Sequence, residues 1–257
     1  MEKLPVHALL ARQLVNRELR NGEPELRLVP VLQDVGRDFL DVGANKGVYA
    51  FCALRRYRKV IAVEANPGMS AALRRIIKLD NEVLPVALSD EVGETVLHIP
   101  IRRGRDVPTR SSLLADANPG FGQRTVTVPT TTIDELGLTE VAVIKIDVEG
   151  HEGSVLRGGM RTLQTARPVC IVECEERHNV GGIEQTFSLF DSIGYRGFFL
   201  HRNRLRDATE FRTGEFQRPE TAKSVRGKRS RDYVNNFIFV HRENEEQIRK
   251  IRAAFPS

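Results

Sequence analysis

The residues best suited to bind a ligand are Asp41, Gly43, Asn45 and Gly47, followed 23 positions after Asp41 by Glu64. The two glycines stand in a turn after an apolar run, where a ligand can approach the backbone and its N–H groups. A carboxylate at Glu64 can accept hydrogen bonds from both hydroxyls of a ribose. Each feature also has a structural explanation, because such turns occur without ligands and Glu64 could be a solvated strand end. Together the features favour a ligand that carries a ribose.

The spacing of the glycines separates this turn from a dinucleotide-binding turn. A dinucleotide fingerprint reads G-x-G-x-x-G, whereas residues 43–47 read Gly-Ala-Asn-Lys-Gly. The turn therefore lacks the glycine that makes room for a pyrophosphate. The sequence disfavours nicotinamide dinucleotides as ligands.

A second group of reactive side chains, Asp147, Glu149 and His151, comes at the end of the apolar run at residues 141–148. At the carboxyl end of a parallel strand, any of the three could act as a base or orient an acceptor, and Asp147 is our first choice. The alternative is structural. Glu149 and Glu152 could complement the positive end of the following helix, and His151 could be a solvated residue of its first turn.

A metal is a further possibility that the sequence leaves open. Glu173 ends a later apolar run and could join Asp147 in holding Mg²⁺, which would acidify a hydroxyl. Two carboxylates are too few to establish such a site. The three cysteines show no disulfide pattern, and Cys170 and Cys174 lie in an apolar run that predicts buried thiols.

These side chains need a scaffold in which strands and helices alternate. Apolar and β-branched runs predict strands at residues 37–42, 59–64, 82–87, 94–101, 124–128, 141–148, 169–174, 195–200 and 233–240. Helical spacing between most of them predicts a mainly parallel sheet that is covered on both faces. Pro85 places the third strand at a sheet edge. We expect a helical extension over residues 1–36, one α/β domain over residues 37–257, and a loop at residues 102–123.

Composition agrees with a globular protein. Of the 257 residues, 40% are hydrophobic and 28% are charged, which excludes a disordered or fibrous chain. No apolar run approaches the roughly 20 residues of a membrane span, and the first residues do not resemble an export signal. We therefore expect a soluble, cytoplasmic protein. The net charge of +5 is weak evidence for nucleic-acid binding, since much of it comes from clusters at residues 102–110 and 223–231.

Three segments read together, residues 39–47, 63–67 and 145–152, resemble the FkbM-type methyltransferases. The similarity continues through shorter segments at residues 86–90, 111–113, 132–136 and 155–158. It spans about residues 37–175, and this order of motifs is far more specific than any one of them.

The resemblance implies a Rossmann-like class I methyltransferase fold, with a seven-stranded, mostly parallel sheet and an antiparallel last strand. It also implies S-adenosylmethionine as the cofactor and methylation of an oxygen on a sugar, glycan or natural product. The cofactor-binding residues that it implies are Asp41, Gly43, Asn45, Gly47, Glu64, Ala65, Ala87, Leu88, Ser89 and Asp147. Of these, the turn residues would surround the methionine part, Glu64 the ribose, and residues 87–89 the adenine edge.

Two other functions compete with this interpretation. The basic clusters could serve an RNA methyltransferase, but they contain no aromatic residue to stack a base, which favours solvated loops. A non-catalytic S-adenosylmethionine-binding protein is opposed by intact Asp41, Glu64 and Asp147. We expect a small-molecule or saccharide acceptor as the partner, and neither a nucleic acid nor a membrane span. The sequence names no acceptor and is compatible with a homodimer.

Overall fold

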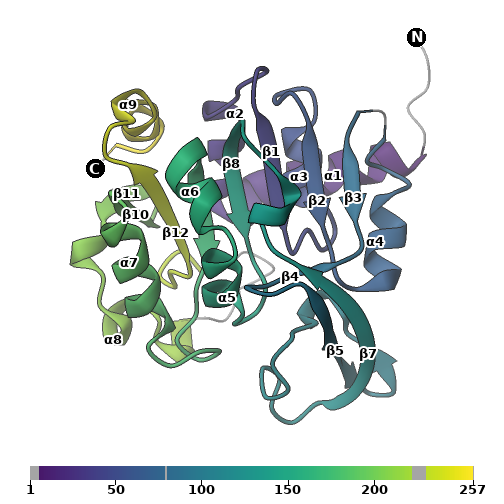
Figure 1. Ribbon diagram of the computed structural model, residues 1–257. Coiled ribbons are helices and arrows are strands. Elements are labelled where there is room, and N and C mark those ends of the chain that lie inside the picture. Colours follow the sequence, from purple (N-terminus) through teal and green to yellow (C-terminus); the bar gives the residue numbers. More distant parts are fainter. Residues whose placement is uncertain (1–5, 79, 222–229, 257) are drawn as a thin grey trace.

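The computed structural model describes residues 6–78, 80–221 and 230–256. A central sheet with helices on both faces forms the body, and a smaller sheet projects from one end of it (Figure 1). Among the described residues, no helix combines the length and the hydropathy that crossing a membrane requires.

The central sheet has eight strands in the order β11-β10-β12-β9-β8-β1-β2-β3. Their bounds are β1 Asp38–Val42, β2 Val60–Val63, β3 Glu82–Leu84, β8 Val141–Ile146, β9 Val169–Glu173, β10 Tyr195–His201, β11 Arg204–Asp207 and β12 Asn236–His241. Strands β3, β2, β1, β8 and β9 are parallel, and β12 runs antiparallel to both of its neighbours. The class of fold and the antiparallel last strand are confirmed.

The expected number of seven strands was wrong by one. Strand β10 turns back at Arg202 and Asn203, which both have positive φ, and the chain then pairs with it as β11. Such a two-residue turn matches the twist of an antiparallel pair. The sequence signal at residues 204–207 is too short and too charged to predict a strand.

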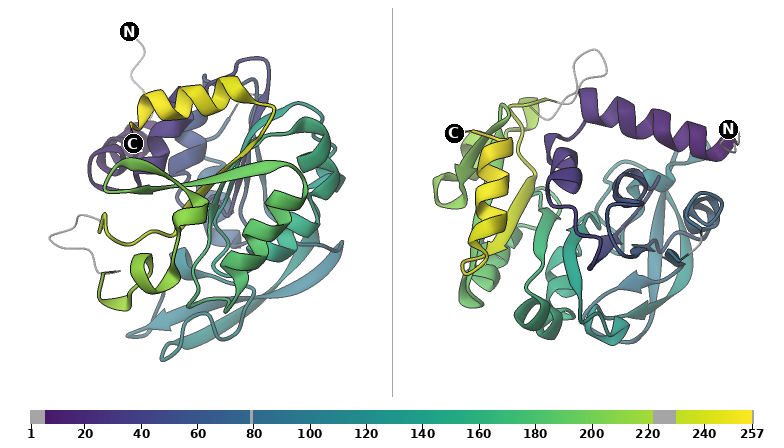
Figure 2. Two further views of the ribbon diagram at one scale, coloured as in Figure 1. Left: turned by 90° about the vertical axis from the view of Figure 1, so that its left-hand side faces the viewer. Right: turned by 90° about the horizontal axis from the view of Figure 1, so that it is seen from above.

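Two layers of helices cover the sheet. One core cluster joins the sheet to helices α1 Val6–Asn21, α2 Leu28–Val31, α3 Val48–Ala53, α4 Pro67–Leu73 and α9 Glu245–Ala254. The other joins the opposite face to α5 Glu152–Arg157, α6 Met160–Ala166, α7 Gly182–Ser192 and α8 Thr213–Phe216. Figure 2 shows α1 and α9 from two further directions. Strands β1, β2, β8 and β12 are buried throughout, as expected for a sheet covered on both faces.

The N-terminal segment shares its core with the rest of the chain. After α1 comes a 3-10 helix, η1 Pro24–Arg27, and then α2, and Leu26 and Leu28 of this segment are buried in the same cluster as strand residues. This shared core does not test the predicted division into a helical extension over residues 1–36 and a domain over residues 37–257, which stays a prediction.

The second sheet, which we call the arm, has the order β4-β7-β5-β6. Its strands are β4 Ala87–Leu88, β5 Gly93–Arg102, β6 Arg105–Asp106 and β7 Gly122–Thr131. The predicted strand at residues 82–87 is thus divided. Strand β3 ends before Pro85 at the edge of the central sheet, as expected, and Ala87 belongs to the arm. The predicted loop at residues 102–123 is partly ordered as β6 and as the 3-10 helix η2 Pro108–Arg110.

Candidate functional site

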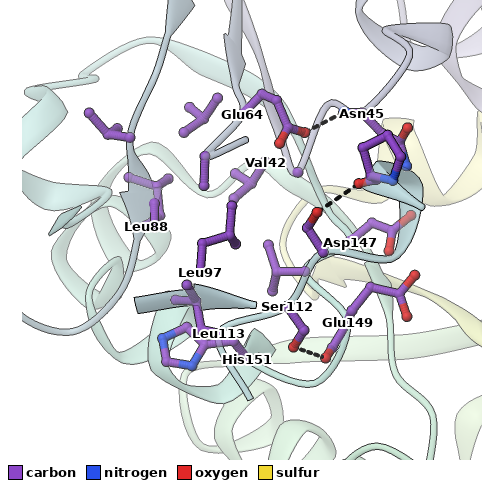
Figure 3. A pocket seen from close by; sticks show the side chains of 18 of the residues that line it. Val42, Asn45, Glu64, Leu88, Leu97, Ser112, Leu113, Asp147, Glu149 and His151 are labelled. Carbon is purple, nitrogen blue, oxygen red and sulfur yellow. Dashed lines mark hydrogen bonds between the residues drawn. The ribbon is translucent and has the colours of Figure 1, made fainter. Parts of the chain in front are cut away.

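A cavity lies between the carboxyl ends of β1, β2 and β8 and the arm, and we call it the arm cavity (Figure 3). The empty space between its lining residues, open solvent included, is about 580 Å³. Nine of the predicted site residues line it: Gly43, Asn45, Glu64, Ala65, Ala87, Leu88, Asp147, Glu149 and His151. These nine residues, which lie between positions 43 and 151, thus meet at the carboxyl edge of the parallel strands, where such sheets bind ligands.

Glu64 follows the last residue of β2 and is only 8% exposed. Its Oε2 accepts a hydrogen bond from the Asn45 N–H at 2.8 Å, and its Oε1 accepts one from the Asn66 N–H at 2.8 Å. Burial raises the pKa of this carboxyl, and the two N–H groups oppose the rise. A carboxylate offers about four acceptor positions, so two remain for a ligand.

Asp41, at the end of β1, stabilises the start of α3. Its Oδ2 accepts from the Ala50 N–H at 2.8 Å, inside the first turn of α3. The N-cap of α3 is Gly47, which has no side chain, so Asp41 supplies the missing cap. Burial raises the pKa of Asp41 to about 7. Asp41 faces a neighbouring cavity rather than the arm cavity, and Gly47 lines neither.

The two glycines of the turn stand where the backbone packs closely against its neighbours. Gly43 and Gly47 both have φ of +75°, a conformation that side chains rarely adopt. A Cβ on Gly43 would lie 1.9 Å from the Asp147 carbonyl oxygen, and one on Gly47 would lie 2.6 Å from Leu73 Cδ2. Gly43 thus lets β1 approach β8 and Gly47 lets α3 pack on α4. Gly43 also lines the arm cavity, and a ligand-binding role for the two glycines stays a prediction.

The opposite end of the arm cavity is apolar. Leu88, Leu97 and Leu113 gather there beside His151, whereas Asp147 and Glu149 lie on the other side (Figure 3). His151 Nε2 lies 3.0 Å from Ser89 Oγ, and burial lowers the pKa of this histidine. The structure thus brings Ser89 and His151 together at the end of the cavity away from Asp147.

Glu149 combines an unusual backbone with an unusual carboxyl. Its φ is +53°, and its carbonyl accepts a hydrogen bond of 2.8 Å from Ser112 Oγ of the arm. Burial, then the nearby charges of Asp147 and Glu175, raise the pKa of Glu149 to about 8. Strained backbone and shifted pKa values are typical of functional sites.

His178 lies beside Glu149 and was missed from the sequence. Its side chain is 6% exposed, and Nε2 lies 3.3 Å from Glu149 Oε2 without the alignment of a hydrogen bond. Neither ring nitrogen has a hydrogen-bond partner within the described part of the chain. His178 stands in a loop after β9, so no periodic pattern points to it.

The remaining carboxylates at this edge hold the backbone and neighbouring side chains. Glu152 Oε1 accepts from the Gly150 N–H at 3.0 Å and the Val148 N–H at 3.3 Å, and burial raises the pKa of Glu152 to about 7. Glu173 accepts from Asn235 Nδ2 at 2.7 Å. No three Asp, Glu, His or Cys side chains of residues 6–78, 80–221 and 230–256 gather as a metal site requires. The structure therefore gives no support to Mg²⁺ between Asp147 and Glu173.

The arm supplies site residues that the sequence did not reveal. Asn45 Nδ2 donates to the Thr109 carbonyl at 3.2 Å, and Asn66 Nδ2 donates to Ser111 Oγ at 3.1 Å. Both partners line the arm cavity, as does Ser112. Asn45 Oδ1 is buried and has no partner among the residues described, which leaves an acceptor for a ligand. Ser111 and Ser112 lie in the segment 111–113 that resembles the family, but the sequence assigns them no role, and Thr109 lies outside every such segment.

The two basic clusters differ in what the structure shows of them. Arg102 and Arg110 place their guanidinium groups 5.8 and 5.9 Å from the centre of the Phe121 ring. The first cluster therefore has an aromatic neighbour that lies outside its own sequence segment. Most of the second cluster, residues 223–229, lies outside the described residues.

Residues 41–222 match the sequence model of the methyltransferase FkbM domain. The structure of methyltransferase FkbM from Methylobacillus flagellatus KT aligns with a TM-score of 0.51 at 14% identity, over 92% of this chain and 55% of that one. The O-methyltransferase from Bacillus cereus in complex with SAH aligns with a TM-score of 0.46 at 14% identity, over 93% and 91%. No curated protein matches the sequence.

Proposed function

The chain belongs to the FkbM methyltransferase family and is an S-adenosylmethionine-dependent methyltransferase, and from this premise we propose that it methylates a hydroxyl oxygen of a sugar, glycan or natural product. The chain spans about 55% of the FkbM structure that it resembles. The identity of the acceptor is therefore part of the proposal.

The observation that carries the proposal is the division of the arm cavity into a carboxylate end and an apolar end. Glu64 is held by two N–H groups and keeps acceptor positions for the two hydroxyls of a ribose. Leu88, Leu97 and Leu113 offer apolar surface for a flat base. This arrangement suits an adenosine, and Ser89 and His151 stand where polar edges of the adenine would be recognised.

Asp147 stands where the two halves of the cofactor would meet, because it lines both the arm cavity and the neighbouring one. When bound, S-adenosylmethionine supplies a methyl group on a positively charged sulfur. The chain's task is then to align the acceptor oxygen with that methyl group and to accept the hydroxyl proton. We assign the proton to Asp147 and the orientation of the acceptor to Glu149. We give His151 an adenine-side role, because it lies against Ser89.

An RNA acceptor is the second candidate, since Phe121 lies beneath two arginines of the arm. Base stacking on an aromatic ring within a basic surface is a common mode of RNA binding. The guanidinium groups already cover this ring, which favours the smaller acceptor. RNA binding that weakens steeply with added salt, and that is lost in Phe121→Ala, would support the second candidate.

The experiment that tests the proposal follows a labelled methyl group. The protein is incubated with labelled S-adenosylmethionine and fractionated extract of its own host, and the labelled product is identified by mass spectrometry. We expect a methyl ether on a small molecule or saccharide, absent when Asp147→Asn replaces the wild type. Label on RNA would support the second candidate instead, and label on nitrogen would overturn the assignment to a hydroxyl. Binding of S-adenosylhomocysteine with no label in any fraction would favour a non-catalytic binding protein.

A further inference from the structure

Ser112 is a buried residue of the arm that joins two different parts of the fold. It is only 1% exposed and lines the arm cavity. Its backbone pairs with His98 of β5, because the Ser112 N–H donates to the His98 carbonyl at 3.1 Å and the His98 N–H donates to the Ser112 carbonyl at 2.8 Å. Its Oγ donates to the Glu149 carbonyl at 2.8 Å (Figure 3). Ser112 therefore attaches the loop that follows β8 to the arm.

The hydroxyl of Ser112 is committed to these contacts. A serine hydroxyl has one hydrogen to donate and two acceptor positions. The hydrogen goes to the Glu149 carbonyl, and Oγ accepts from the Leu114 N–H at 3.0 Å. The donor of this side chain is thus in use and is not offered to a ligand in the arm cavity. A role for the hydrogen bond that it donates therefore has to act through Glu149.

The turn at Glu149 and Gly150 is held from two sides. Glu149 has φ of +53°, a conformation that residues with a side chain rarely adopt, and Gly150 has φ of +105°. The arm contacts the turn at a second point, because a Cβ on Gly150 would lie 2.7 Å from Leu114 Cδ1 and 3.2 Å from His178 Cβ. From the side of α5, Glu152 Oε1 accepts from the Gly150 N–H at 3.0 Å. The strained turn thus lies between the arm and α5.

The backbone of this turn decides where the Glu149 carboxyl lies. The carboxyl lines the arm cavity together with Asp147, and its Oε2 lies 3.3 Å from His178 Nε2. After burial, which has the largest effect, the charges that act on the pKa of Glu149 are those of Asp147, Glu175, Arg177 and Arg110. A change in the φ of Glu149 would turn the side chain away from these groups. A hydrogen bond that fixes the Glu149 backbone therefore fixes the surroundings of its carboxyl.

The segment that precedes Ser112 is anchored at the Glu64 end of the arm cavity. Asn45 Nδ2 donates to the Thr109 carbonyl at 3.2 Å, and Asn66 Nδ2 donates to Ser111 Oγ at 3.1 Å. The backbone N–H groups of the same two asparagines hold Glu64. These anchors restrict the positions that the Ser112 hydroxyl can take, so it can hold Glu149 firmly.

We propose that Ser112 is a positioning residue for methyl transfer, which acts through Glu149. Its hydroxyl holds the Glu149 backbone in the conformation that keeps the carboxyl in the arm cavity with Asp147, where it orients the acceptor hydroxyl. The inference rests on the proposed function, in which Glu149 orients the acceptor, and adds the residue that keeps Glu149 in place. The arm thereby serves the acceptor side of the site as well as the Glu64 side.

The test compares two substitutions of Ser112. Ser112→Ala removes the hydroxyl, and Ser112→Cys keeps a side chain of similar shape whose S–H is a weak donor. Ser192→Ala, an exposed change on α7, is the control. Calorimetry measures the affinity for S-adenosylhomocysteine, and labelled S-adenosylmethionine measures the rate of methyl transfer to the fraction of host extract that the wild type labels. Thermal unfolding verifies that each variant is folded.

A further measurement follows the Glu149 carboxyl without any acceptor. Urea unfolding gives the stability that Glu149→Gln adds to the wild type and to each Ser112 variant, at pH 4.5 and at pH 8. Glu149→Gln should stabilise the wild type at pH 8 and not at pH 4.5, because burial raises the pKa of Glu149 to about 8 and the unfolded chain releases this proton at lower pH. A structural role of Ser112 that does not involve Glu149 would leave this gain unchanged.

Ser112→Ala should bind S-adenosylhomocysteine as the wild type does but transfer the methyl group about tenfold to hundredfold more slowly, since a small displacement of an orienting group has a large effect on rate. The gain from Glu149→Gln at pH 8 should disappear in Ser112→Ala, because the released carboxyl turns to solvent and regains its ordinary pKa. Ser112→Cys should lie between Ser112→Ala and the wild type, and Ser192→Ala should match the wild type.

If either the rate of transfer or the gain at pH 8 stays as in the wild type, the assignment of Ser112 is wrong. A loss of S-adenosylhomocysteine affinity as large as the loss of rate would also overturn it, because the hydroxyl would then serve the cofactor. If Ser112→Ala does not fold, Ser112→Cys decides by the same measurements. If the wild type labels no fraction, the proposed function fails, and the gain at pH 8 still decides whether Ser112 holds Glu149.

Discussion

Asp41 and Glu64 are both buried acids at strand ends, yet their oxygens are used differently. Asp41 Oδ2 accepts a hydrogen bond from the Ala50 N–H in the first turn of α3. The site depends on Asp41 because this bond holds the turn before α3 in place. Glu64 holds the loop through both oxygens and still faces the arm cavity. The spacing of the two residues predicted that they lie close together. It did not predict their different roles, because spacing does not reveal from which N–H groups each carboxylate accepts hydrogen bonds.

Glu149 provides a prediction about pH. Its pKa is about 8 in the folded protein and 4.5 ordinarily, so between these pH values the folded chain keeps a proton that the unfolded chain has released. The free energy of unfolding therefore falls as pH rises through this window. Glu149→Gln resembles the protonated carboxyl and removes the cost. Urea unfolding should show this variant more stable than the wild type by about 1 kcal/mol at pH 8, and no more stable at pH 4.5.

Glu184→Gln, an exposed change on α7, is the matched control for Glu149→Gln. Its stability should follow that of the wild type across the same range of pH. If Glu149→Gln also follows the wild type across the range, the carboxyl of Glu149 is not held in its neutral form by the fold.

At the scale of elements, the alternation of strands and helices predicted the central sheet because its strands are apolar on both faces. The boundaries were predicted best for β1, β9 and β10, each of which differs from its predicted range by one residue. Residues 82–87 were predicted as one strand because Pro85 was expected within a strand at the edge of the sheet. In the structure, β3 ends at Leu84, just before Pro85. The arm was missed as a separate sheet, since the patterns of β5 and β7 predict strands but not the sheet that they join.

Gly43 ties two elements together and supplies the prediction at this scale. Gly43→Ala places a Cβ 1.9 Å from the Asp147 carbonyl oxygen and forces a side chain into positive φ, so β1 and β8 have to move apart. Urea unfolding should show a loss of at least about 2 kcal/mol. Gly104→Ala has nearly the same φ, +72°, with nothing within 4 Å of the new Cβ, and should cost about 1 kcal/mol. Equal losses in the two variants would mean that the approach of β1 to β8 is not tight.

At the scale of the molecule, two segments far apart in sequence line two neighbouring cavities. Thr109 and Ser112 line the arm cavity, and Glu23 of the N-terminal segment lines the neighbouring cavity that Asp41 faces. Local periodicity cannot predict such contacts, because each joins side chains from different layers of the fold. His178 was missed as a site residue for the same reason. What the sequence does predict is the carboxyl edge where Glu64 and Asp147 meet.

The central claim is that the arm cavity holds the adenosine of S-adenosylmethionine by its ribose. Calorimetric titration of S-adenosylhomocysteine into the wild type, Glu64→Ala and the exposed control Glu94→Ala tests it most directly. We predict binding to the wild type and the control, a loss of about hundredfold or more in Glu64→Ala, and no binding of NAD by any of them. Equal affinity in Glu64→Ala and the wild type would contradict the account.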